Sequence, residues 1–137
     1  MYSETLLDHF LHPRNVGFMK DANGVGTGGD PSCGDYVRIF IRVDGPKIAK
    51  ASFQVQGCPS AIATASVFVE AIIGMTLKEA WEISDPEVVS AVGGLPEEKI
   101  HCSNLAVTAF QQAVIDHLIR AGELTEQDLI DEPPAED

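Results

Sequence analysis

The segment Tyr36–Val43 alternates between apolar and polar side chains, a period of two that is typical of a β-strand with one buried face. The buried face would consist of Val37, Ile39, Ile41 and Val43. The opposite face would carry Arg38, Phe40 and Arg42. Ala51–Gln56 continues the pattern with Phe53 and Val55 inward, and the Asp-Gly-Pro-Lys sequence at 44–47 predicts a turn. We therefore expect these two strands to form a hairpin.

Helical periodicity and capping signals surround this hairpin. The predicted helices are Ser3–Leu11, Ser60–Ile73, Thr76–Ile83, a short one from Asp85-Pro86, and Ser103–Ile119. Pro59 suits the first turn of the second helix and Gly74 its C-terminus, while Thr76 and Glu79 form a capping-box pattern. The Gly-rich segment Asn23–Ser32 predicts a loop or an irregular edge strand. This order of helices and strands along the chain predicts an α+β fold, with a small antiparallel sheet of about three strands and helices packed on one face.

The 137 residues suit one compact domain, and their charge is uneven. Seven of the 21 acidic residues lie after Gly122, where there is no Lys or Arg. We therefore predict a domain over 1–122 and an acidic, partly disordered tail over 123–137. The formal net charge of −12 argues against nucleic acid as a partner, because phosphate binding needs a basic surface.

No segment has the length and apolar character of a membrane span, and the first residues do not resemble a signal peptide. These features predict a cytoplasmic protein without a membrane partner. In that reducing compartment, three cysteines are expected to act as ligands, nucleophiles or core residues rather than as disulfides.

The first cysteine lies in Cys33-Gly34-Asp35, directly before the alternating strand. Residues i and i+2 of an extended chain point the same way, so Asp35 would share the core face of Val37 and Ile39. An acid at that position suggests a metal, a cap or a water-filled opening. Taken alone, the segment is explained more simply by a buried Cys33 and a turn Asp35, because cysteine is often simply buried.

The second cysteine, Cys58, lies where the second strand ends and a helix begins. A helix N-terminus stabilises a thiolate and lowers its pKa, so Cys58 could bind a metal or attack sulfur. The alternative is a cysteine packed under the helix end.

The third cysteine follows a histidine, in Lys99-Ile100-His101-Cys102. Imidazole and thiolate are common ligands of borderline and soft metals, although such a pair also occurs by chance. The remaining histidines carry less weight. We expect His9 and His12 at the surface or at a partner, and His117 exposed or packed.

Together, the candidates Cys33, Asp35, Cys58, His101 and Cys102 all lie at the boundaries of predicted elements. No CxxC motif is present, which excludes a zinc ribbon or a thioredoxin-like site. A closed structural zinc site needs four ligands, so five candidates, one of them a hard oxygen donor, predict a site that exchanges ligands. We expect the five side chains to converge in space.

These motifs, with Pro13-Arg14-Asn15-Val16-Gly17 and Gly57-Cys58-Pro59-Ser60, resemble the IscU/NifU-type iron–sulfur cluster assembly scaffolds over roughly Tyr2 to Arg120. The resemblance implies a scaffold, not an enzyme, on which a [2Fe–2S] cluster forms from iron and sulfur. It implies Cys33, Cys58 and Cys102 as ligands, completed by His101 or Asp35. Zinc can occupy the same residues when cluster is absent.

The resemblance also implies roles and partners. Cys102 would accept sulfur as a persulfide from a cysteine desulfurase, Asp35 would favour cluster release, and Lys99 is a further candidate for the chemistry. An electron donor such as a ferredoxin and recipient apo-proteins are expected. Glu97 and Glu98 replace a proline and an apolar residue of the family's chaperone-binding segment, so the chaperone partner stays open. The alternatives are a zinc-dependent sulfurtransferase and a structural zinc module.

Overall fold

The computed structural model describes residues 3–29, 34–95 and 101–122, and the side chains of 101–103 are outside this description. The elements are α1 (Glu4–Leu11), β1 (Gly24–Gly29), β2 (Tyr36–Asp44), β3 (Lys47–Gln56), α2 (Pro59–Ile72), α3 (Leu77–Trp81), α4 (Asp85–Ala91) and α5 (His101–Arg120). The predicted acidic tail over 123–137 falls outside the described residues.

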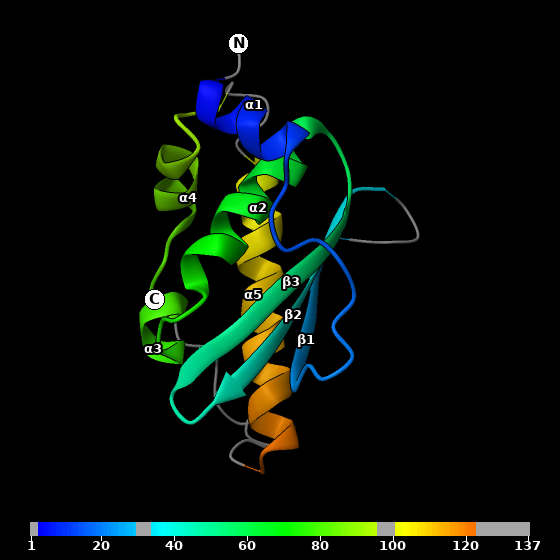
Figure 1. Ribbon diagram of the computed structural model, residues 1–137, viewed down its shortest axis with the longest axis vertical. Helices are drawn as coiled ribbons and strands as arrows, with labels where there is room; N and C mark the ends of the chain where they lie inside the picture. The colour runs from blue at the N-terminus through cyan, green and yellow to red at the C-terminus, as the bar shows by residue number, and fades with distance from the viewer. Residues whose placement is uncertain (1–2, 30–33, 96–100, 123–137) are drawn as a thin grey trace.

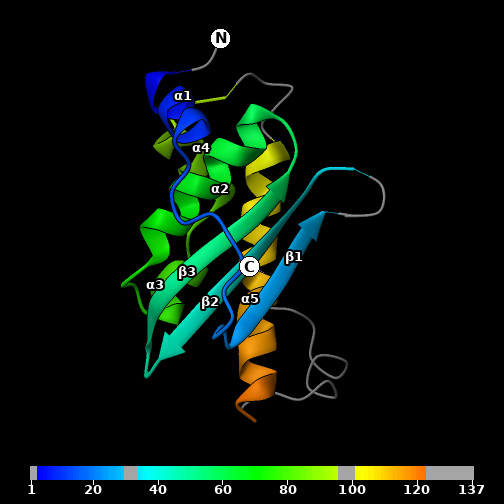
Figure 2. The ribbon, with the colours of Figure 1, turned by 45° about the vertical axis from the view of Figure 1, so that its right-hand side comes forward.

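The strands form one antiparallel sheet in the order β1-β2-β3. Ile39 in the central strand is paired with Gly26 on one side and Phe53 on the other. α2 and α5 run along one face of this sheet, and α1 lies beyond one end of it (Figures 1 and 2). The predicted α+β class and the helical cover on one face are confirmed.

The main core lies between the sheet and the two long helices. The strand residues predicted to point inward, Val37, Ile39, Ile41, Val43 and Phe53, are buried there. They meet Phe68 of α2 and Phe110 of α5, whose rings pack edge to face with centroids 5.5 Å apart. Phe40, predicted on the opposite face, is also buried because the ring of Phe18 covers it at 5.4 Å.

The edge strand β1 contributes glycines to this packing instead of apolar side chains. A Cβ atom at Gly26 would lie 2.2 Å from both the Ala109 carbonyl oxygen and the Ala113 nitrogen of α5. Gly24 and Gly28 are similarly close to the backbone of α5. The glycines therefore allow a helix to lie directly on the strand, and the edge-strand alternative predicted for this segment is confirmed.

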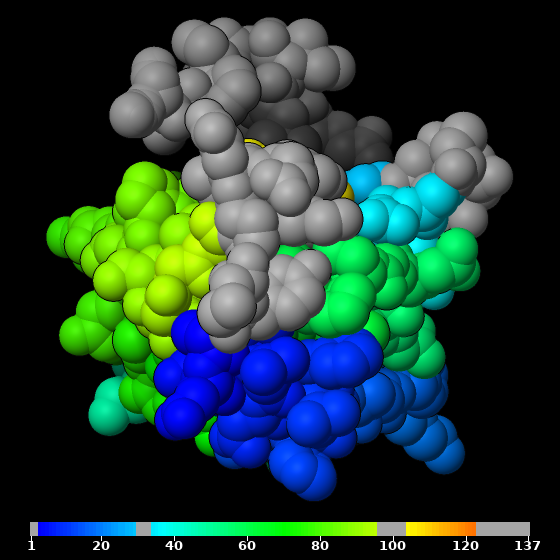
Figure 3. Space-filling view, turned by 90° about the horizontal axis from the view of Figure 1, so that it is seen from above, coloured from blue at the N-terminus to red at the C-terminus, as the bar shows by residue number. Residues whose placement is uncertain are grey.

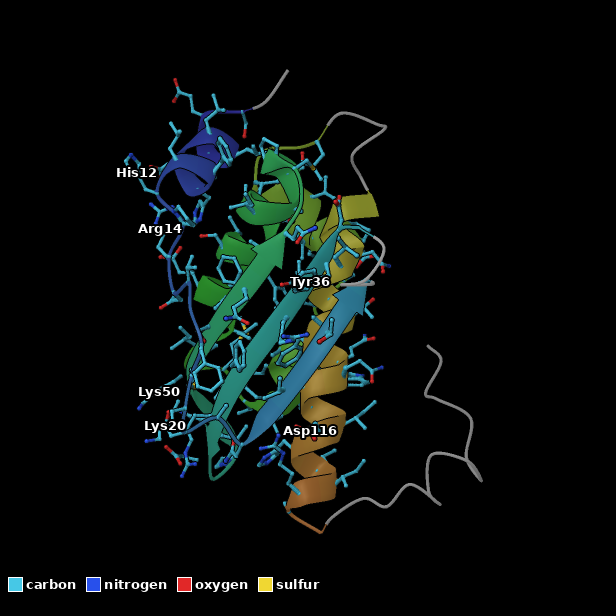
Figure 4. All side chains as sticks on the ribbon, turned by 90° about the vertical axis from the view of Figure 1, so that its right-hand side faces the viewer. His12, Arg14, Lys20, Tyr36, Lys50 and Asp116 are labelled. Carbon is cyan, nitrogen blue, oxygen red and sulfur yellow. The ribbon has the colours of Figure 1, made fainter. Side chains whose placement is uncertain are left out.

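The outer edge of β1 is partly closed by a side chain of α5. Asp116 accepts a hydrogen bond from the Val25 N–H at 2.9 Å, and the Arg120 guanidinium lies 2.9 Å from the same carboxylate oxygen. Figure 4 labels Asp116 beside this strand. Such a cap reduces the tendency of an exposed edge to pair with another strand.

Helix ends follow the capping signals in the sequence. Cys58 is the N-cap of α2, with Pro59 in the first turn, and Gly74 beyond its C-terminus has φ +93°. Thr76 and Glu79 form the predicted capping box of α3. Within the described part of the chain, none of the helices combines the length and the apolar character needed to cross a membrane.

α1 is attached to α2 and α4 through a second, smaller core. Leu6, Ala63 and Val92 are its buried residues. The Ser3 hydroxyl donates to the Val92 carbonyl oxygen and accepts from the Leu6 N–H at 3.0 Å. This attachment fixes the position of the first helix over the start of α2.

His9 is buried in this attachment, so its prediction as a surface residue is wrong. Its Nδ1 lies 2.8 Å from the Ser66 hydroxyl, which also accepts the Arg14 N–H at 2.9 Å. The donor in the contact between Nδ1 and the Ser66 hydroxyl is set by the tautomer of the ring, and Nε2 lies 3.8 Å from the Glu70 carboxylate. His12 is exposed, as predicted.

Burial, and secondarily the nearby Arg14 charge, lowers the pKa of His9 below its usual value of about 6.5, against smaller opposing effects of Glu70 and Asp8. The imidazole of His9 is then protonated more readily in the unfolded chain than in the folded one. The stability that the fold gains by keeping His9 neutral is therefore complete above about pH 6.5 and is lost as the pH falls through the folded-state pKa. We expect the free energy of unfolding to fall more steeply between pH 7.5 and 5.5 in the wild type than in His9→Gln, as measured by urea unfolding. The exposed-site control His12→Gln should keep the wild-type slope, and an unchanged slope in His9→Gln would contradict this role.

Candidate functional site

Asp35 and Cys58 are neighbours at one end of the sheet. The pairing of Tyr36 with Gln56 brings the start of β2 beside the end of β3, and Figure 4 labels Tyr36 at this end. A Cβ atom at Gly57 would lie 3.3 Å from Cγ and 3.4 Å from Oδ2 of Asp35. The carboxylate therefore lies against the residue that precedes Cys58.

Asp35 is exposed, although it precedes a strand whose inward face is buried. The acid therefore does not enter the core formed by Val37 and Ile39, and it is open to water. Among the described residues, a Cβ atom at Gly34 would meet no atom within 4 Å.

Cys58 occupies the predicted junction between strand and helix. It is partly buried, has extended backbone angles (φ −76°, ψ 171°), and its carbonyl oxygen accepts the Ile62 N–H at 3.2 Å. The first turn of α2 contains no acidic residue, so no carboxylate there offsets the partial positive charge of the helix N-terminus. A helix N-terminus favours the thiolate form of a cysteine, whereas a carboxylate as near as that of Asp35 opposes it.

The helix that begins at His101 starts at the same end of the molecule. A Cβ atom at Gly28 would lie 2.2 Å from the Leu105 carbonyl oxygen, and Gly29 is paired with Tyr36. The first turns of α5 therefore lie beside the strand ends that adjoin Asp35 and Cys58. Figure 3 looks down on this end, where α1 (blue), α2 (green) and the start of β2 (cyan) lie next to one another.

The rest of the predicted site lies outside the described residues. Cys33 and Lys99 are not described, nor are the side chains of His101 and Cys102. Among the side chains that are described, no group of three or more His, Cys, Asp or Glu is placed to hold a metal. The structure thus brings together Asp35, Cys58 and the start of α5, and the convergence of all five side chains stays a prediction.

Ser60 is a polar residue near Cys58 that the sequence analysis did not single out. It is completely buried, and its hydroxyl has no hydrogen-bond partner. Its position two residues after Cys58, in the first turn of a predicted helix, was the signal available in the sequence.

The fold and this end of the sheet define a small α+β domain with a thiol and a carboxylate where the strands meet the helices. The chain belongs to the family of NifU-like N-terminal domains, whose model matches residues 1–123. The resemblance recognised in the sequence motifs is therefore confirmed.

Relatives in this family carry informative names. The chain is 47% identical over 124 residues to iron–sulfur cluster assembly scaffold protein IscU 1 of Archaeoglobus fulgidus, covering 90% of this chain and 81% of the relative. It is 41% identical over 127 residues to the scaffold protein IscU of Aquifex aeolicus, covering 91% and 81%. The nitrogen fixation protein NifU of Azotobacter chroococcum is 40% identical, but the match covers only 38% of that longer protein and 85% of this chain.

Solved structures agree with this assignment. A crystal structure described as that of an iron–sulfur cluster assembly scaffold protein for the SUF system, from Fervidobacterium islandicum, superposes with a TM-score of 0.68. It is 25% identical and covers 82% of this chain and 96% of its own. A NifU-like N-terminal domain from Brucella abortus shares the fold at 16% identity, with a TM-score of 0.66 and coverage of 84% and 92%.

Proposed function

We propose that this chain is a scaffold on which an iron–sulfur cluster is assembled and from which it passes to apo-proteins. The observation that carries the proposal is the Asp35 carboxylate against Gly57, beside Cys58 and at the end of the sheet where α5 begins with His101 and Cys102. The names of the Archaeoglobus and Aquifex relatives support the same role.

The ligand atoms of the proposed site suit iron that is bound for a time and then passed on. Thiolates are the usual protein ligands of iron–sulfur clusters, and we assign Cys33, Cys58 and Cys102 to this role. His101 or Asp35 completes the set, and zinc occupies it when no cluster is bound. The exposed Asp35 carboxylate is a hard donor among soft ones, so it favours exchange and release over permanent binding.

Sulfur arrives by thiol chemistry. The Cys102 thiolate attacks the outer sulfur of a persulfide on a cysteine desulfurase, and the desulfurase thiolate leaves. Cys102 then carries the persulfide, and two electrons from a donor such as a ferredoxin release its outer sulfur as sulfide and restore the thiolate. Two sulfides and two ferric ions give the oxidised [2Fe–2S] cluster; if the iron enters as ferrous ion, each iron supplies one of the four electrons and the donor supplies the other two.

Anaerobic reconstitution with iron, cysteine and a desulfurase tests the proposal. We expect the visible absorption of a [2Fe–2S] cluster on the chain, and transfer of that cluster to an added apo-ferredoxin. Sulfur transfer with retained zinc and no cluster would instead indicate a zinc-dependent sulfurtransferase. If neither cluster nor persulfide forms, the remaining interpretation is a structural zinc module.

Replacing Asp35 should prolong the life of the cluster. Asp35→Ala removes an exchangeable oxygen donor and a negative charge from the open side of the site, so cluster loss should slow several-fold. The decay of visible absorption after addition of a chelator measures this. Asp44→Ala removes an equally exposed carboxylate at the opposite end of β2 and should decay like the wild type. Faster loss from Asp35→Ala would make this residue a plain stabilising ligand.

A further inference from the structure

The face of the sheet that is turned away from α2 and α5 is basic, in a chain that is acidic as a whole. None of the described helices lies on this face, as Figure 2 shows. The alternation along β2 and β3 places Arg38, Arg42 and Lys50 on it, and Arg42 is paired with Lys50. The helices α2 to α4 differ in charge, because their charged residues are Glu70, Lys78, Glu79, Asp85 and Glu87.

Arg42 and Lys50 lie directly opposite each other on neighbouring strands, an arrangement in which like charges repel. Asp21 contacts both: its carboxylate accepts from Lys50 Nζ at 3.0 Å, and its carbonyl oxygen accepts from Arg42 Nη1 at 3.1 Å. Lys20 is exposed and has no ion pair with any described residue, and Figure 4 labels it close to Lys50. Even with Asp44 3.6 Å from Arg42, the basic residues of this face outnumber the acidic ones that contact them.

An exposed aromatic ring lies among these cations. Phe18 packs edge to face on Phe40 with ring centroids 5.4 Å apart, yet 70% of Phe18 is exposed. Phe40 lies between Arg38 and Arg42 on the same face of β2. We call this surface, made of Phe18 with Lys20, Arg38, Arg42 and Lys50, the basic face. An apolar centre with cations around it suits an acidic segment that also contains apolar residues.

Such a segment follows α5 in this chain. Residues 123–137 contain seven acidic residues and no Lys or Arg, and Asp128-Leu129-Ile130-Asp131 places two apolar side chains between two carboxylates. α5 ends near the basic face, because Arg120 Nη1 donates to the Ala22 carbonyl oxygen at 3.5 Å. Extended, the 15 residues span up to about 50 Å, whereas the nine residues of β2 span roughly 30 Å. The segment therefore starts close enough and is long enough to reach the whole face.

We propose that the acidic segment 123–137 docks on the basic face of its own chain. Leu129 and Ile130 pack against Phe18, and the surrounding carboxylates pair with Lys20, Arg42 and Lys50. Exposed ion pairs are individually weak, but a tether raises the effective concentration of the segment, so several weak contacts act together. Once docked, the segment offsets the repulsion between Arg42 and Lys50, and a protein with an acidic surface has to displace it to reach this face.

Carbodiimide crosslinking of the full chain tests the proposal, because the reagent joins a carboxylate to a lysine amine that contacts it. Mass spectrometry then identifies the joined peptides. We expect the segment 123–137 to be joined to Lys20 or Lys50 several-fold more often than to Lys78, an exposed lysine on the helical side. The pair Asp21 and Lys50, 3.0 Å apart, is the positive control. Raising the salt from 0.1 to 1 M shortens the screening length from about 10 to about 3 Å and should reduce these crosslinks several-fold.

Substitutions that keep every amine and every carboxylate test the apolar contact. Leu129→Ser combined with Ile130→Ser should reduce the crosslinks to Lys20 and Lys50 several-fold, and Phe18→Ala should do the same. Leu11→Ala is the control, because it shortens an exposed apolar side chain on α1 and should leave the crosslinks unchanged. Circular dichroism checks that each variant is folded.

Three results would overturn the inference. The first is crosslinking to Lys78 as frequent as to Lys20 and Lys50. The second is a chain in which Asp21 and Lys50 are joined but the segment 123–137 is not joined to either lysine. The third, seen with a mixture of isotopically light and heavy chains, is crosslinking mainly between two copies. None of these measurements involves a cluster, so they stand or fall separately from the proposed function.

Discussion

A Cys102→Ser variant is expected to accept no sulfur from a cysteine desulfurase while keeping its fold. The attacking species in sulfur transfer is a thiolate, and a serine hydroxyl is far too weakly acidic to replace it. Cys102 is the second residue of α5 and follows His101 in the sequence; in general, a helix N-terminus or a protonated imidazole favours the thiolate of a nearby cysteine. Mass spectrometry after a single-turnover mixing with persulfide-loaded desulfurase measures the acquired sulfur, and circular dichroism checks the fold.

Two matched substitutions locate the acceptor. Cys33→Ser and Cys58→Ser should impair cluster binding but retain most of the initial persulfide on Cys102. If Cys102→Ser gains sulfur as fast as the wild type, the acceptor role belongs to Cys33 or Cys58 instead.

Gly26→Ala is expected to destabilise the domain by roughly 3 kcal/mol or more, at or above the upper end of ordinary overpacking costs. The new methyl group would lie 2.2 Å from two backbone atoms of α5, and a backbone cannot move aside as a side chain can. The helix would have to shift away from β1 and disturb the core around Phe110. Urea unfolding followed by circular dichroism measures the loss.

Gly34→Ala is the control for the Gly26 substitution. It adds the same methyl group where no atom of the described residues lies within 4 Å, so stability should stay within about 0.5 kcal/mol of the wild type. If Gly26→Ala and Gly34→Ala are equally stable, the close approach of α5 to β1 is not required for the stability of the domain.

The elements that the sequence predicted well are those set by local patterns. β2 and β3 follow from period-two alternation, and α2 and α3 follow from capping residues at their ends. β1 was predicted only as one of two alternatives, because its glycines have no apolar period. What makes them a strand is contact with α5, about 80 residues later, which no local pattern records.

In the site, too, the sequence predicted the features that follow from local patterns and missed those that depend on contacts between distant segments. The nearness of Asp35 and Cys58 follows from the predicted hairpin, because Asp35 precedes one strand and Cys58 follows its partner. The burial of His9 was missed although it lies three residues after Leu6, on the inward side of α1. A histidine there gives no hydrophobic signal, and its partner Ser66 is known only once α1 rests on α2.

The glycine face of β1 also has a consequence for synthesis on the ribosome. The face of β1 that lies against the α5 backbone carries Gly24, Gly26 and Gly28, so this face is buried only when the last described helix has emerged. The main core likewise needs Phe110, and its contacts join segments far apart in the chain, which slows folding. Cys33 and Cys58 therefore leave the ribosome well before α5 does, so both thiols belong to a nascent chain that has not yet folded when they emerge.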